Sequence, residues 1–181
     1  MRQLQFGFLA LCLSLMGQDI LASPLNIRQE SCVELSTTTP NWKLSNARSS
    51  DWPGGGGGRV QFFARHVPTS ELSSCDVEYR LNGTTGEIID YDPTSTHDCI
   101  NFGSSKLNTT VQLDMDTLLL NMRSSWTCEE DETVTYTATG STNLDRDTSP
   151  GACLVEPSQV GDSTTCPIAN VEVEGVLEVK E

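Results

Sequence analysis

Residues 60–66 read Val-Gln-Phe-Phe-Ala-Arg-His, and small or large apolar side chains recur there at every second position. Val60, Phe62 and Ala64 fall on one side of an extended chain, because successive side chains of a strand point to opposite faces. This spacing is typical of a β-strand that buries one of its faces. The stretch therefore predicts a sheet with a packed side and an outer side.

The same period of two recurs along most of the chain, in residues 76–81, 111–114, 118–126, 133–139 and 171–179. The run from 111 to 126 is too long for one strand, so we expect a turn near Asp116 and Thr117 to split it into a hairpin. No segment has the periodicity of an amphipathic helix. Short strands separated by turns predict an all-β fold, either a compact antiparallel β-barrel or a sandwich stapled by disulfides.

Glycines mark two special places in this pattern. Pro53 is followed by five glycines, Gly54 to Gly58, and we expect this run to be irregular and mobile because glycine loses much backbone entropy on ordering. Gly175 falls on the buried side of the last predicted strand, where a missing side chain suggests a bulge or the close approach of another segment.

The N-terminal residues have the features of a secretory leader. Residues 1–22 carry Arg2, an apolar stretch and small residues near Ala22, which is typical of a signal peptide; the stretch is too short for a membrane span. We expect residues 23–31 to form a short leader and residues 32–181 a single secreted domain. Six cysteines then remain, an even number typical of an extracellular disulfide framework with 15 possible connectivities: Cys32, Cys75, Cys99, Cys128, Cys153 and Cys166.

The formal net charge of −14 argues against binding to nucleic acids or anionic membranes, since both need clustered Lys and Arg. Asn82 and Asn108 each begin an N-x-Thr acceptor pattern for N-glycosylation, which predicts a glycoprotein if the sites are used. No pattern for a cofactor is present, and none is expected to bind.

The sequence gives little evidence for catalytic residues. His66 and His97 lack a nucleophile-elbow motif, and we interpret both as surface histidines. Paired carboxylates of a glycosidase would need one acid with a raised pKa, whereas loop and outward carboxylates stay solvated. A calcium site lacks the expected spacing. We therefore predict no catalytic and no metal-binding role for these carboxylates: Asp114, Asp116, Glu129, Glu130, Asp131 and Glu132.

The three tryptophans divide into two groups. Trp42 and Trp126 lie in predicted strands and are expected in the core, where aromatic rings supply buried area. Trp52 lies beside Pro53 and the glycine run. It is the tryptophan expected to be exposed, and it is a candidate for contact with a partner.

Several stretches together give a family resemblance. The chain resembles the Alternaria major-allergen family of small fungal secreted proteins, over roughly Cys32 to Val179. The residues that carry it are Arg28-Gln29, Cys32, Trp42-Lys43-Leu44-Ser45, Cys75, Cys99, Leu118-Leu119-Leu120, residues 134–139, Cys153 and Cys166.

The resemblance implies a compact antiparallel β-barrel, secretion, and a role as an allergen, effector or elicitor that meets plant defence proteins such as thaumatin-like proteins. It also implies no known catalytic residues. It pairs Cys75 with Cys99 and Cys153 with Cys166, while the family's first cysteine joins two chains. Because Cys128 is additional here, Cys32–Cys128 becomes the third pair, and the sequence does not decide between a monomer and a dimer.

The function hypothesis is thus a secreted, non-enzymatic fungal protein that recognises host extracellular proteins. The alternative is an extracellular protein that binds a small molecule or a cell-wall carbohydrate. A secreted hydrolase ranks third, because it needs buried carboxylates or histidines in a cleft.

Overall fold

The computed structural model describes residues 30–103 and 106–178, so the predicted signal peptide and most of the predicted leader lie outside the described residues. The elements are α1 (Cys32–Thr38), β1 (Trp42–Trp52), a 3-10 turn (Pro53–Gly55), β2 (Gly57–His66), β3 (Leu72–Leu81), β4 (Ile88–Ile89), β5 (His97–Asp98), β6 (Ile100–Asn101), β7 (Asn108–Leu113), β8 (Leu119–Cys128), β9 (Asp131–Asn143), β10 (Leu154–Glu156), β11 (Ser163–Pro167), β12 (Val171–Val173) and β13 (Val176–Leu177).

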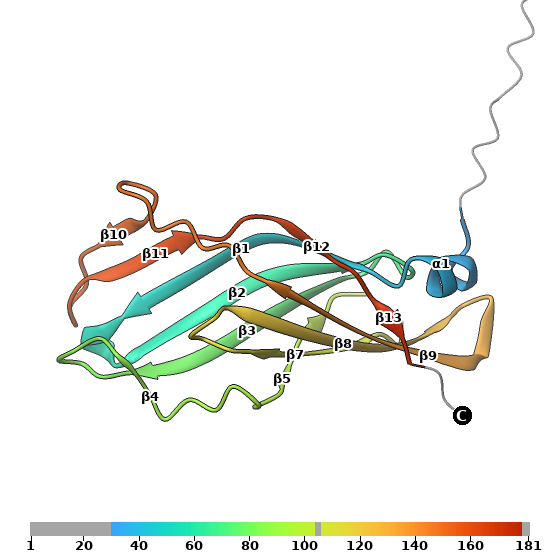
Figure 1. Ribbon diagram of the computed structural model, residues 1–181, viewed down its shortest axis with the longest axis horizontal. Coiled ribbons are helices and arrows are strands. Elements are labelled where there is room, and N and C mark those ends of the chain that lie inside the picture. Colours follow the sequence, from blue (N-terminus) through green and yellow to red (C-terminus); the bar gives the residue numbers. More distant parts are fainter. Residues whose placement is uncertain (1–29, 104–105, 179–181) are drawn as a thin grey trace, which may run out of the picture.

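The strands form two antiparallel sheets, which confirms the all-β, disulfide-stapled fold (Figure 1). Sheet A has the order β10-β11-β1-β2-β3-β4, with β12 also paired to β1 and β6 to β3. Sheet B has the order β13-β9-β8-β7-β5. The predicted hairpin is confirmed, because β7 and β8 pair in register around a turn that contains Asp116 and Thr117.

The core lies between the two sheets and contains the alternating apolar residues of both. Val60, Phe62 and Ala64 from β2 are at most 2% exposed, as their spacing predicted. Trp42 and Trp126 are also buried, which confirms their assignment to the core. Each indole N–H is satisfied, since Trp42 Nε1 donates to Ser124 Oγ at 2.9 Å and Trp126 Nε1 donates to Ser36 Oγ at 2.8 Å.

A β-bulge in β1 keeps the apolar face of that strand turned inward. The register with β2 shifts between Ser45 and Arg48, and Asn46 takes a positive φ of 52°, which asparagine tolerates better than most residues. Because of the extra residue, Leu44 and Ala47 are both buried although they are three positions apart.

Helix α1 was not expected from the sequence pattern. It is short and is held by local polar contacts: Ser31 Oγ accepts from the Glu34 N–H at its start, and Ser36 is fully buried against Trp126. The Cys32–Cys128 disulfide ties the first turn to the end of β8. The helix therefore closes one end of the molecule, opposite the end where β10 and β11 lie (Figure 1).

Three disulfides join the same cysteines that the sequence analysis paired, namely Cys32–Cys128, Cys75–Cys99 and Cys153–Cys166. Since Cys32 is bonded within its own chain, its sulfur is not available to link two chains.

The glycine run is more regular than expected. Gly57 and Gly58 are the first residues of β2, and each pairs with both neighbouring strands. External contacts explain this order: a Cβ on Gly58 would lie 2.2 Å from the Tyr79 ring, and a Cβ on Gly54 would lie 1.4 Å from the Val160 carbonyl oxygen. The prediction of an irregular segment is therefore wrong for the strand part of the run, where side chains would not fit.

Gly175 confirms the prediction of a close approach. The chain passes there from β12 in sheet A to β13 in sheet B, and a Cβ on Gly175 would lie 1.8 Å from the Pro40 carbonyl oxygen. Its N–H donates to Asn41 Oδ1 at 3.0 Å.

We expect Gly175→Ala to lower the free energy of unfolding by about 2–3 kcal/mol, because the added methyl group meets backbone that must move. Urea unfolding measures this, with Gly83→Ala as the control, since the nearest atom to a Cβ there is 3.3 Å away. Equal stabilities of the two variants would contradict the predicted overlap.

Candidate interaction surface

The outer face of sheet A carries five cations, and carboxylates share its outward rows, namely Asp76 and Glu78 of β3 and Glu172 of β12. The chain has 11 Lys and Arg residues, of which Arg2, Arg28 and Lys180 lie outside the described residues. Five of the remaining eight occupy outward positions of β1, β2 and β3, as strand alternation and register require: Lys43, Arg48, Arg59, Arg65 and Arg80. More than half of the described Lys and Arg residues therefore lie on one face of a chain whose net charge is −14.

Apolar side chains lie among these cations. Ile100 is 68% exposed, Phe102 62% and Leu154 59%. Ile100 is opposite Ser74 in the row of outward residues that contains Phe63, and the Phe63 and Phe102 rings are 6.3 Å apart. We call these three residues, with the partly buried Phe63 and Trp52, the apolar part of the sheet A face.

Disulfides hold two exposed apolar segments in place without burying them. Cys99 directly precedes Ile100 and is bonded to the buried Cys75 of β3. In the same way, Cys153 directly precedes Leu154 and is bonded to Cys166 of β11. An apolar side chain that is fixed and exposed costs less conformational entropy when a partner covers it, so these segments suit recognition.

Trp52 lies at one end of this face and is only partly exposed. The Arg59 guanidinium lies 5.8 Å from the centre of the Trp52 ring, a cation-π contact, and a Cβ on Gly57 would lie 2.7 Å from the indole nitrogen. Trp52 is therefore less exposed than expected, because Gly57 and Arg59 lie against its ring.

The arginines of the face differ in their partners. Arg59 lies 3.7 Å from Asp76, and Arg80 lies 3.0 Å from Asp90. Arg48 instead donates to the neutral Gln61 Oε1 at 3.1–3.2 Å, and Arg65 donates to the Ser70 carbonyl oxygen at 3.2 Å. Within the part of the chain that the structure describes, neither of these two guanidinium groups has an ion pair.

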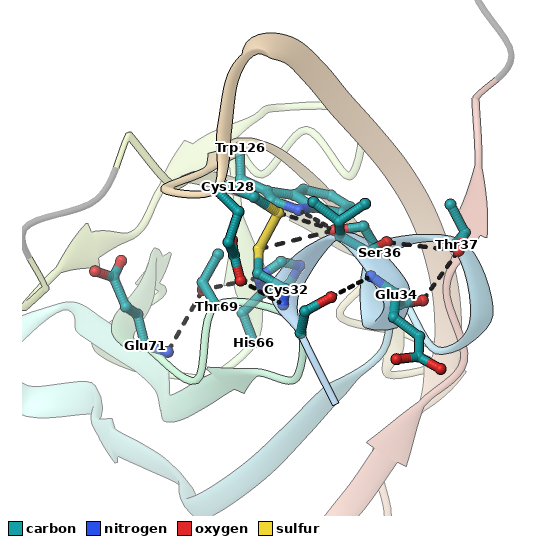
Figure 2. The surroundings of a disulfide bond; sticks show 12 residues. Cys32, Glu34, Ser36, Thr37, His66, Thr69, Glu71, Trp126 and Cys128 are labelled. Carbon is teal, nitrogen blue, oxygen red and sulfur yellow. Dashed lines mark hydrogen bonds between the residues drawn. A yellow bond between two sulfur atoms is a disulfide. The ribbon is translucent and has the colours of Figure 1, made fainter. Parts of the chain in front are cut away.

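His66 is not a surface residue, so that prediction is wrong. It is fully buried at the end of β2, where Nδ1 lies 3.0 Å from Thr69 Oγ1 and the ring packs edge-on against Trp126 at 4.4 Å (Figure 2). Burial lowers its pKa to about 3, although the charge of Glu71 opposes this effect. A buried neutral imidazole next to a disulfide has no access to a substrate.

The candidate carboxylates stabilise turns. Asp114 accepts hydrogen bonds from the backbone N–H groups of Thr117 and Asp116, and these bonds lower its pKa. The Thr133 side chain and N–H lower the pKa of Asp131 in the same way. These shifts are opposite to the raised pKa that a general acid needs. Asp116, Glu129, Glu130 and Glu132 are exposed.

Two further candidate sites carry little chemistry. Cys32, Cys128 and Glu130 lie close enough to share a metal ion, but both sulfurs are used in the disulfide and offer no thiolate. A groove of about 650 Å³ on the outer face of sheet B is lined by hydroxyl and amide side chains, by the charged Arg123 and Glu174 and by apolar residues, with no aromatic ring for stacking on a sugar. His97, on β5, is partly buried.

The two acceptor asparagines lie in different settings. Asn82 is partly buried, and its Oδ1 accepts from the N–H groups of Thr84 and Thr85 in the turn after β3. Asn108 is exposed at the start of β7.

No protein-family model, curated protein or solved structure matches this chain. Among the described residues, no helix is long and apolar enough to cross a membrane.

The sequence pattern predicted a surface role for Trp52, which stays a prediction, and did not predict the exposure of Ile100, Phe102 and Leu154. These residues follow Cys99 and Cys153 in segments that show no strand alternation. The signal that was available is an apolar residue directly after a disulfide-bonded cysteine in a loop, where it is held near the surface.

Proposed function

We propose that this chain is a secreted, non-enzymatic recognition protein of the fungal effector or allergen type, which contacts host extracellular proteins through the outer face of sheet A. Thaumatin-like defence proteins are the partner class that the family resemblance suggests. The observation that carries the proposal is the combination on one rigid face of exposed apolar side chains with arginines and a tryptophan. Interface cores are enriched in aromatic residues and arginine.

The electrostatics of the described residues support a binding role over catalysis. The buried histidine is held neutral, and the turn carboxylates with shifted pKa values are held ionised. A hydrolase would need a desolvated acid or base that opens into a cleft. The three disulfides fit an extracellular setting, because thiols persist as disulfides in oxidising surroundings.

The test is capture of a partner from plant extracellular fluid by immobilised, oxidised protein. We expect a defined protein to be retained by the wild type and to be lost, or retained at least tenfold less, by the double variant Ile100→Ser/Phe102→Ser. Both side chains are mainly exposed, so the variant should fold normally.

Arg123→Gln is the matched control, because Arg123 is an exposed arginine on the outer face of sheet B. It should retain the partner like the wild type. Equal retention by the Ile100/Phe102 variant would exclude the sheet A face as the site, and failure of all proteins to retain anything would count against a protein partner.

A further inference from the structure

Resting on the proposed function, we infer that the partner segment bound by the sheet A face is acidic, with an apolar side chain between two carboxylates. Around Phe63, two arginines that have no ion pair among the described residues flank an aromatic pair.

Arg48 and Arg65 supply the charge of this area. Both are exposed, and among the described residues each donates only to a neutral oxygen, so no carboxylate offsets its charge and further N–H donors remain free. Guanidinium groups match carboxylates in shape and bind them with two parallel hydrogen bonds. Carboxylates share this face, since Asp76 accepts from Gln61 Nε2 in the row that contains Arg48, so a partner's carboxylates are directed to these two guanidinium groups and not to the face as a whole.

The spacing of the outward side chains on β2 matches that of an extended partner segment. Along β2 the outward residues are Arg65, Phe63 and Gln61, and Arg48 lies directly opposite Gln61 on β1. Arg65 and Gln61 are four residues apart, which is about 13 Å in a strand, with Phe63 midway. An extended partner segment has the same repeat, so side chains at its first, third and fifth positions can meet a cation, the aromatic pair and a second cation.

An apolar centre lies between the two cations. Phe102 packs on Phe63 and, with Ile100, leaves most of its side chain exposed. An apolar side chain at the middle position of the partner would cover these groups and exclude water from the neighbouring guanidinium–carboxylate contacts, which strengthens them.

The probe is a short fluorescein-labelled peptide with leucine midway between two glutamates, compared with peptides in which both glutamates are glutamine or lysine. Fluorescence anisotropy should show binding of the glutamate peptide that weakens as NaCl is raised, because salt screens exposed charges. Binding should be at least tenfold weaker for Arg48→Gln/Arg65→Gln and unchanged for Arg123→Gln. Equal binding of the glutamine peptide, or no binding of the glutamate peptide, would overturn the inference.

Two further comparisons separate this inference from the proposed function and from another ligand class. If a plant protein is captured by the wild type and by Arg48→Gln/Arg65→Gln but lost with Ile100→Ser/Phe102→Ser, the proposed function stands and the acidic partner segment is wrong. The same assay is run with polygalacturonate, an anionic polysaccharide. If it binds more tightly than the peptide and the binding is lost in Arg48→Gln/Arg65→Gln, the inference of an acidic protein segment is wrong and the ligand is an anionic polysaccharide.

Discussion

Replacement of both Cys32 and Cys128 with alanine is expected to lower the free energy of unfolding by about 4–5 kcal/mol, because this disulfide closes by far the longest loop. Its cysteines are 96 residues apart, against 24 and 13 for the other two disulfides. In the chain-entropy account a longer loop restricts the unfolded chain more strongly. The bond also holds α1, whose buried Ser36 accepts the hydrogen bond of Trp126.

The matched control is Cys153→Ala/Cys166→Ala, for which the same account gives about 3 kcal/mol because the loop is short. Urea unfolding of both double variants measures the difference. The dependence of the free energy of unfolding on urea concentration is compared as well, because equal slopes show that the unfolded states are similar. A greater loss for the Cys153/Cys166 variant would show that loop length does not govern the stability of this framework.

Acidification from pH 6.5 towards pH 3 is expected to cost about 4–5 kcal/mol of stability through His66 alone. Its pKa in the folded protein is lowered from 6.5 to about 3 by burial. Between these two values the unfolded chain binds a proton that the folded protein does not, so the free energy of unfolding falls as the pH falls. The contribution is fully present above pH 6.5.

The variant His66→Gln, which carries no ionisable group, isolates this effect from that of the carboxylates. Urea unfolding of wild type and variant at pH 8 gives the cost of the substitution itself. On going down to pH 4, the wild type should lose about 3 kcal/mol more than the variant. Parallel stability curves over this range would mean that His66 is protonated without penalty in the folded protein.

The strands could be predicted from sequence where one face is buried, as in β2. Val60, Phe62 and Ala64 are buried at every second position of β2, and His66 is the next residue in this alternation. The burial of His66 could therefore have been predicted by extending the alternation to the end of the strand. The surface prediction for His66 rested on the absence of a catalytic motif, which says nothing about burial. Histidine has intermediate burial in proteins, which makes position in the strand the better guide.

Other features depend on contacts that local pattern does not contain. Helix α1 spans only seven residues and is stabilised by a disulfide to residue 128 and by the buried Ser36, so no periodicity predicts it. The bulge at Asn46 and the ordered glycine run likewise depend on neighbouring strands and on Tyr79 and Val160. For the candidate surface, Ile100 and Phe102 reach Phe63 only because β6 pairs with β3.

The position of the turn after β3 has a consequence for how the protein should be produced for study. Gly83 lies next to the Pro53 carbonyl oxygen, so Asn82 is near the Trp52 end of the sheet A face, whereas Asn108 belongs to sheet B. A branched oligosaccharide on Asn82 would occupy volume beside Trp52 and shield that end, and one on Asn108 would not. Material from a bacterial host, which lacks this sugar, would therefore present a wider accessible platform than material from a eukaryotic host that modifies Asn82.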